Sequence, residues 1–179
     1  ATSSGVGVLE FGFFSKDYRQ IWWLDDVSLQ DVNASNAEQL HNGNFENETL
    51  NGWDIVGDSS AINLAWNQGD VRDKCAMHYW NNKPFNVIIK QKLKGLSDGK
   101  YTLSCWTQGN GLASKYQLFV KQNGVEMTTD IKDDGWNRWH QTSIKNIEVK
   151  NGEVEIGFIL NGRPDTWGSI DDIEFYVQK

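Results

Sequence analysis

The sequence is poor in the residues that most often mark metal sites, disulfide scaffolds and membrane spans. It has only two cysteines, two prolines, two methionines and three histidines in 179 residues. The histidines, His41, His78 and His140, do not follow the spacing of a metal-ligand set, so we expect no zinc site. No segment approaches the roughly 20 consecutive apolar residues that cross a bilayer, and the first residues lack the basic and apolar regions of a signal peptide. A membrane partner is therefore not expected.

Clusters of basic residues are missing as well. The formal net charge is −7 and no run of lysine and arginine appears, whereas binding to phosphates requires a concentrated basic face. We therefore expect no nucleic-acid partner, and a neutral partner fits the composition better. The length matches about one domain by the usual range of roughly 100 to 200 residues, so a second complete domain is not expected.

The cysteines do not define a cellular compartment, because a domain of this length can build its core without disulfides. Counting by twos, Cys75 shares a strand face with Met77 and Tyr79, and Cys105 shares one with Leu103. Both cysteines are therefore predicted to point into the core. They are either buried free thiols or a disulfide pair.

What the sequence does contain is alternation of apolar and polar residues, which predicts an all-β protein. The clearest predicted strands are 75–80, 85–93, 100–108, 116–122, 154–160 and 170–177. Glycine-containing turns such as "QNG" at 122–124 and "KNG" at 150–152 separate them. Many short strands joined in this way indicate a β-sandwich.

The sequence contains one internal repeat. Residues 8–29 align with residues 154–175 through Glu-x-Gly-Phe, a tryptophan and an Asp-Asp pair, with one residue of slippage. We therefore interpret residues 1–32 as the last strands of a preceding tandem module or as an extra hairpin, residues 33–39 as a linker and residues 40–179 as the main module. Apolar strands such as these leave unpaired edges, so we expect the first segment to pair with something.

Five motifs carry a resemblance to a known family. They are "LHNGNFENETLNGWDIV" at 40–56, "MHYW" at 77–80, "GLSDGKYTLSCWTQG" at 95–109, "DDGWNRW" at 133–139 and "WGSIDDIEFY" at 167–176. Together they resemble the galactose-binding-like carbohydrate-binding modules, and most of all family 61, which is found attached to endo-β-1,4-galactanases. The resemblance implies a jelly-roll β-sandwich.

The resemblance also implies a function. We expect a secreted or cell-surface, non-catalytic module of a bacterial protein that binds a plant-type polysaccharide, β-1,4-galactan or another galactoside, and targets an attached catalytic domain to it. The alternative is a structural or adhesin-type spacer domain, because one fold serves many functions. A glycoside hydrolase would need two carboxylates about 5 to 9.5 Å apart in a cleft. Among 24 acidic residues such pairs prove nothing, and the resemblance reaches no catalytic family.

Asp171 and Glu46 are the candidate metal ligands. Asp171 shares strand parity with Ile173 and Phe175, which predicts that its carboxylate points into the sandwich, where an ionised group needs a partner. The resemblance places Glu46 beside the final strand and implies a structural Ca²⁺ at the two carboxylates, with oxygen ligands that suit this ion. The alternative is that Asp171 caps a turn by accepting backbone N–H bonds.

Tryptophan is in excess, with nine residues, and supplies the candidate sugar site. Strand parity places Trp80, Trp106 and Gln108 on faces away from the core, and Trp167 lies in the Gly- and Pro-containing stretch "NGRPDTWG". The polar candidates next to these tryptophans in sequence are Asn82, Asn161 and Arg163. The alternative is that Trp80 and Trp106 cover the second sheet.

The other tryptophans of the main module are assigned more broadly. Trp53 is predicted to be a core residue, one of Trp136 and Trp139 to anchor a loop, and Trp66 to lie in a polar loop with no role assigned.

Overall fold

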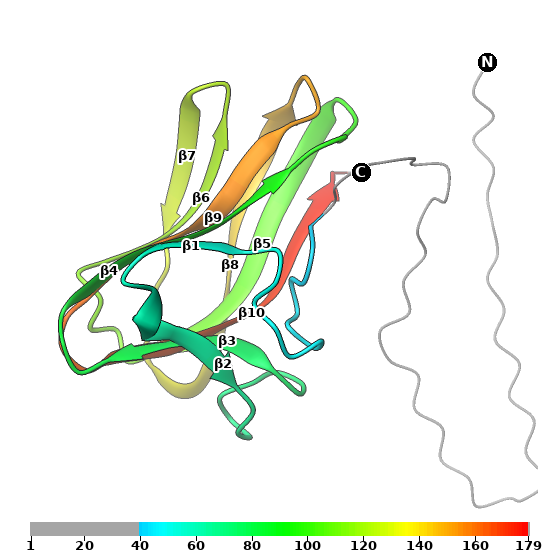
Figure 1. The fold of residues 1–179 in the computed structure, drawn as a ribbon. Coiled ribbons are helices and arrows are strands. Elements are labelled where there is room, and N and C mark those ends of the chain that lie inside the picture. The colour runs from blue at the N-terminus through cyan, green and yellow to red at the C-terminus, as the bar shows by residue number, and fades with distance from the viewer. Residues whose placement is uncertain (1–39, 179) are drawn as a thin grey trace, which may run out of the picture. The chain divides into compact units, whose positions relative to one another are not determined.

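The computed structural model describes residues 40–178, which form a sandwich of two five-stranded sheets (Figure 1). The first sheet has the order β1-β4-β9-β6-β7, built from Asp54–Gly57, Phe85–Leu93, Val154–Gly162, Lys115–Gln122 and Val125–Asp130. The second has the order β2-β3-β10-β5-β8, built from Ile62–Ala65, Ala76–Asn81, Thr166–Val177, Gly99–Gly109 and Gly135–Val149. A short 3-10 helix, η1 (Ser59–Ala61), connects β1 to β2.

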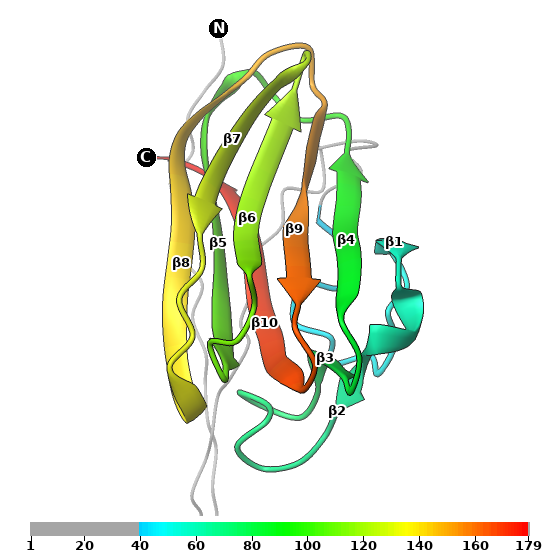
Figure 2. The same ribbon diagram turned by 90° about the vertical axis from the view of Figure 1, so that its left-hand side faces the viewer.

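All pairings between these strands are antiparallel, and the two sheets lie face to face (Figure 2). The prediction of an all-β jelly-roll sandwich is confirmed. Each of the six predicted strands is present: 85–93 has the predicted bounds, and the other five differ by a few residues at one or both ends. The sequence analysis missed β1, β2, β7 and β8. Within residues 40–178 no helix is long and apolar enough to cross a membrane.

The core lies between the two sheets and is formed by the residues of each sheet that point inward. Cys75 and Cys105 are both fully buried and both free, so the prediction of buried thiols is confirmed. Trp53 is also a core residue, as predicted. Its ring lies 6.2 Å from that of Phe45 and 6.3 Å from that of Phe158, and its Nε1 donates to the Asn42 carbonyl. The beginning of the module is thereby fixed to the core.

A β-bulge in β10 corrects the argument made for Asp171. Ile170 and Ile173 are both core residues although they are three apart, because the register with β5 shifts between Asp171 and Glu174 and Asp172 adopts a φ of 46°. Asp171 is the cross-strand partner of Trp106, whose side chain is on the outer face, so the Asp171 side chain also projects from that face. The prediction that it points into the sandwich, made from its alternation with Ile173, is wrong. Asp171 is nevertheless only 1% exposed, because the segment before β3 covers its side chain.

The interpretations made for residues 1–32 and 33–39 fall outside the described residues. This includes the prediction that residues 6–32 form paired strands.

Candidate functional site

Two tryptophans lie side by side on the outer face of the sheet β2-β3-β10-β5-β8. Trp80 of β3 and Trp167 of β10 are direct cross-strand partners, so both side chains project from the same face. Trp80 is 47% exposed, and Trp167 is half-buried. We call these two residues the tryptophan pair. Their adjacency could not be read from the sequence, in which they are far apart.

The next row of the same face is polar. His78, Ser169 and Gln108 stand opposite one another on β3, β10 and β5. The Nδ1 atom of His78 lies 3.1 Å from the Ser169 hydroxyl. Burial lowers the pKa of His78, so the imidazole is neutral at neutral pH and provides a hydrogen bond to this row without a charge.

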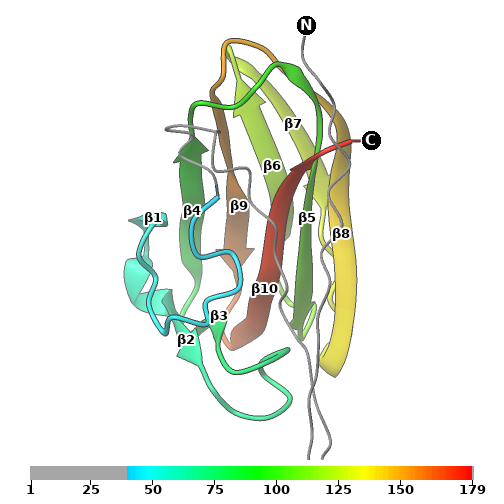
Figure 3. The ribbon, with the colours of Figure 1, turned by 90° about the vertical axis from the view of Figure 1, so that its right-hand side faces the viewer.

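The segment of residues 66–75, which we call the strap, connects β2 to β3 and returns across this face (Figure 3). Gln108 holds it. The side chain of Gln108 is fully buried, its Nε2 donates to the Gly69 carbonyl, and its Oε1 accepts from the Asn137 backbone N–H. Trp136 also packs against the strap, and its Nε1 donates to Asp70 at 3.1 Å. Gln108 therefore positions the strap and offers no free amide to a ligand.

Replacing Gln108 by Leu tests this positioning role. The change leaves the Gly69 carbonyl and the Asn137 N–H without their partner, which costs about 1 to 3 kcal/mol of unfolding free energy for buried groups. Denaturant unfolding measures the loss, and faster hydrogen exchange at Asn137 locates it. The matched control is Gln117→Leu, which removes a surface bond to Asp130 and should change stability by less than about 0.5 kcal/mol. Equal stability of Q108L and the wild type would contradict this role.

Trp106 is on the outer face, as its parity predicted, but an arginine covers it. The guanidinium of Arg72 lies 4.0 Å from the Trp106 ring centroid and 5.9 Å from that of Trp139, and its Nε pairs with Asp172. This stacking is a cation–π contact. Trp106 therefore anchors the strap, while the tryptophan pair stays accessible.

The polar candidates are distributed over different parts of the molecule. Asn82 follows β3 and is exposed, and Arg163 lies in the exposed turn before β10. The Asp165 N–H donates to the Asn81 carbonyl at 2.8 Å, so the Asn82 and Arg163 turns are neighbours near the tryptophan pair. Asn161 belongs to the other sheet, where it pairs with Asn86 and Lys115. It lies apart from the tryptophan pair.

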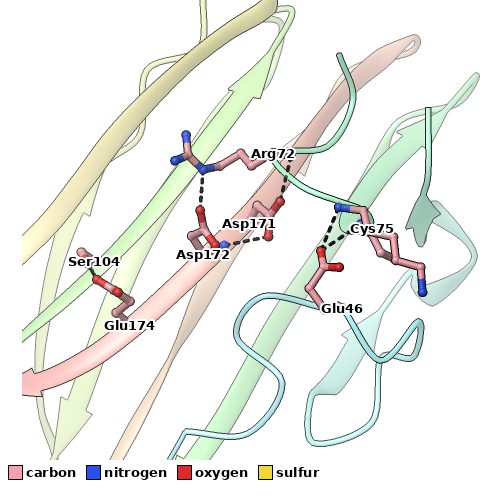
Figure 4. A network of polar contacts seen from close by, with 8 residues as sticks. Glu46, Arg72, Cys75, Ser104, Asp171, Asp172 and Glu174 are labelled. Carbon is pink, nitrogen blue, oxygen red and sulfur yellow. Dashed lines mark hydrogen bonds and ion pairs between the residues drawn. The ribbon is translucent and has the colours of Figure 1, made fainter. Parts of the chain in front are cut away.

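Glu46 and Asp171 approach the same stretch of backbone at the end of the strap (Figure 4). Oε1 of Glu46 accepts from the backbone N–H groups of Lys74 and Cys75 at 3.0 and 3.1 Å. Oδ2 of Asp171 accepts from the Arg72 N–H at 3.1 Å, and its Oδ1 accepts from the Asp172 N–H at 2.8 Å. Both carboxylates thus accept backbone hydrogen bonds, as the alternative interpretation of Asp171 proposed.

The charge of Asp171 is nevertheless poorly compensated. Burial raises the pKa of its carboxyl to about 7, and the neighbouring Asp172 and Glu46 carboxylates act in the same direction. Arg72 gives its side chain to Asp172 and contacts Asp171 only through its backbone. In the described part of the chain, no three His, Cys, Asp or Glu side chains form a group that could hold a metal by themselves. A cation here would need backbone oxygens in addition to the two carboxylates.

The sequence analysis did not anticipate a cavity at the end of the sandwich where β5 and β7 finish. It has a volume of about 720 Å³, and the connections 110–114 and 131–134 contribute to its walls. Asp133 lies in it and accepts hydrogen bonds from Tyr79 Oη at 2.9 Å and from Thr107 Oγ1 at 3.0 Å. Burial raises the pKa of Asp133. We call this space the end cavity.

Two glycines make room for this cluster. Gly109 and Gly168 are cross-strand partners on β5 and β10. A Cβ atom on Gly168 would lie 2.2 Å from Tyr79 Oη, and one on Gly109 would lie 2.5 Å from Asp133 Oδ2. The "TQG" and "TWG" motifs at 107–109 and 166–168 therefore serve one buried polar cluster, and this paired T-x-G pattern is the signal that could have revealed it.

Comparison with solved structures defines the class of protein. The chain is similar to the carbohydrate-binding module TmCBM61 in complex with beta-1,4-galactotriose, with 27% identity, a TM-score of 0.73 and coverage of 79% of this chain and 99% of that one. It also shares its fold with a family 16 carbohydrate-binding module, at 14% identity, a TM-score of 0.54 and coverage of 76% and 97%. The described residues therefore have the β-sandwich fold of carbohydrate-binding modules.

The same fold occurs within an enzyme. The enzymatically active domain of the bacteriophage CBA120 tailspike protein 4 matches with 11% identity and a TM-score of 0.64, over 79% of this chain but only 21% of that chain. No family model matches the sequence. No curated protein matches it either.

Proposed function

We propose that this module binds β-1,4-galactan or a related galactoside at the tryptophan pair and does not catalyse a reaction. The observation that carries the proposal is the cross-strand pair of the exposed Trp80 and the half-buried Trp167, whose flat rings suit the apolar C–H face of a pyranose. The similarity to TmCBM61, described in complex with beta-1,4-galactotriose, supports galactose as the sugar. The neighbouring Asn82 and Arg163 supply hydrogen-bond donors for its hydroxyls.

The proposal also covers the location of the module and the domain to which it is attached. A galactan is an extracellular polymer, so the module acts outside the cell and holds an attached catalytic domain near its substrate. This role requires that the module bind the polymer but not that it catalyse a reaction.

Calorimetric titration of the wild-type protein against purified polysaccharides tests the proposal. We expect binding to β-1,4-galactan and no release of reducing sugar from it. The controls are a β-1,4-glucan and a β-1,4-mannan, which differ from galactan in sugar stereochemistry. Absence of binding to every polysaccharide would favour a spacer or adhesin-type role, and release of reducing ends would establish an enzyme.

We further propose that Glu46 and Asp171 hold a structural Ca²⁺. The residues fit this group, because hard carboxylate oxygens suit Ca²⁺ and because, among residues 40–178, no cationic side chain pairs with the buried Asp171 carboxylate. The ion would supply this missing positive charge and would join the beginning of the module, which contains Glu46, to its last strand.

A further inference from the structure

We propose that Trp136 is a third aromatic platform of the glycan site, so that the module recognises a chain of several sugar residues and not a single sugar. The identity of the sugar rests on the proposed function, whereas the position of the platform does not. Trp136 is 58% exposed, which is more than either member of the tryptophan pair.

Trp136 lies at the same end of the sheet as the tryptophan pair. Gly135, the residue before it, pairs with Gly109 of β5, and Gly109 pairs with Gly168 of β10. Gly168 directly follows Trp167. Neighbouring strands lie about 4.8 Å apart, so roughly 10 Å separate the β8 backbone in this row from that of β10.

The strap fixes the orientation of the Trp136 indole. Nε1 donates to Asp70, and a Cβ atom on Gly69 would lie 2.4 Å from Cζ2 and 2.9 Å from Cε2 of the ring. These three ring atoms belong to one edge of the indole, so the strap holds this edge while more than half of the residue stays exposed. A ring that is already oriented loses little conformational freedom when a ligand stacks on it.

The strap also shows on which face the ring lies. It crosses the outer face of the sheet, where Gln108 holds the Gly69 carbonyl (Figure 3). Trp136 is therefore on the face that carries the tryptophan pair. Single exposed apolar side chains are common on protein surfaces, but three tryptophans at one end of one sheet face form a group.

A wide bulge in β8 places the ring there. From Gly135 to His140 this strand advances by five residues, whereas the paired stretch of β5 advances by two. Within the bulge Asn137 has a φ of 57°, and its backbone N–H donates to the buried Gln108 side chain. None of the residues 136–140 is fully buried, so the extra residues do not serve the core. Bulges next to binding sites commonly re-aim a side chain in this way.

The ligand that fits this arrangement is an uncharged glycan chain. The flat rings suit the apolar C–H faces of pyranoses, and the Asp70 carboxylate at the indole edge disfavours an anionic polymer. Because two strand spacings separate Trp136 from Trp167, one sugar ring cannot stack on both. A chain of several sugar residues can contact both platforms at once.

Trp136→Ala tests the platform, with β-1,4-galactobiose and β-1,4-galactohexaose as ligands. We expect the wild-type protein to bind the hexaose at least about tenfold more tightly than the biose. The variant should lose about tenfold in affinity for the hexaose, whereas its affinity for the biose stays within about twofold. Calorimetric titration measures these affinities. In the wild type, the indole N–H resonance of Trp136 should shift with the hexaose and not with the biose.

Trp66→Ala is the matched control. Trp66 is 56% exposed and also belongs to the strap, but it follows Ala65, which pairs with Ala76. Ala76 lies four residues from Trp80 along β3, or roughly 13 Å. W66A should therefore bind both sugars as the wild type does. A loss of hexaose affinity in W66A equal to that in W136A would overturn the assignment to Trp136.

Trp136→Phe separates the platform from a role in anchoring the strap. This variant keeps a flat ring and loses the hydrogen bond to Asp70, so its affinity for the hexaose should stay within about threefold of the wild type. A loss in W136F as large as that in W136A would assign the effect to the strap and overturn the platform. Equal losses for both sugars in W136A, together with a lower melting temperature, would do the same.

The platform and galactan binding fail separately. If W136A binds the hexaose as tightly as the wild type does, the platform is overturned while galactan binding at the tryptophan pair stands. If no galacto-oligosaccharide binds, the same measurements are made with the β-1,4-linked glucose and mannose bioses and hexaoses. A loss confined to one of these hexaoses in W136A keeps the platform and overturns galactan as the ligand, and absence of binding to all of them overturns both.

Discussion

Replacing Trp80 or Trp167 by Ala is expected to weaken binding of β-1,4-galactan about thirtyfold while the module stays folded. An aromatic residue at the centre of a binding site contributes on the order of 2 kcal/mol, which corresponds to this factor. Trp80 is 47% exposed, so its removal leaves no large cavity in the core. Calorimetric titration and a thermal melt of each variant provide both measurements.

Two further variants calibrate this result. Tyr176→Ala removes an exposed aromatic side chain at the other end of β10 and should bind galactan normally. Trp53→Ala removes a core aromatic residue and should cost roughly 3 to 5 kcal/mol of folding stability. Undiminished galactan binding in folded W80A and W167A would place the polysaccharide site elsewhere.

Removing Ca²⁺ with a strong chelator at pH 8 should lower the melting temperature on the order of 10 °C. A ligand present at 100 times its dissociation constant stabilises a protein by about 2.7 kcal/mol, and each kcal/mol shifts the midpoint of a domain by roughly 2 to 8 °C. The physical reason is the buried carboxylate of Asp171, whose charge the ion would balance. Calorimetric melts with and without added Ca²⁺ measure the shift.

Asp171→Asn distinguishes a bound ion from a simple turn cap. The neutral variant should not respond to the chelator, and its melting temperature should equal or exceed that of the chelated wild type, because the unpaired buried charge is gone. Asp134→Asn, an exposed acid that pairs with His140, is the control and should respond to Ca²⁺ as the wild type does. Identical wild-type melts in chelator and in Ca²⁺, with no calcium in the purified protein, would rule out the structural ion.

The strands that could be predicted are those in which one face is buried. In β4 the pattern from Phe85 to Leu93 alternates almost perfectly between buried and accessible residues. In β7 no residue is fully buried, so nothing in the sequence separates its two faces. In β8 the buried Ile144 and Ile147 are three residues apart, because Asn146 has a φ of 59° and the register with β5 shifts nearby. A period of two cannot detect such a strand.

The candidate site was predictable to the extent that it depends on strand parity. Parity placed Trp80 and Gln108 on the outer face, and the structure agrees. It could not show that the strap covers Gln108 or that Arg72 covers Trp106, because these contacts depend on the path of an irregular segment. Nearness in sequence was a poor guide for Asn161, since β9 and β10 belong to different sheets.

The bulge in β10 gives this strand one residue that the core does not use. Between Trp106 and Ser104 β5 advances by two positions, whereas β10 advances by three, from Asp171 to Glu174. A strand without Asp172 would still place Ile170 and Ile173 in the interior, now as ordinary alternating neighbours. It would lose the carboxylate that pairs with Arg72 and so the hold on the strap. The extra residue thus lets the outer face of this sheet change by insertion or deletion at this point while the hydrophobic interior keeps its order.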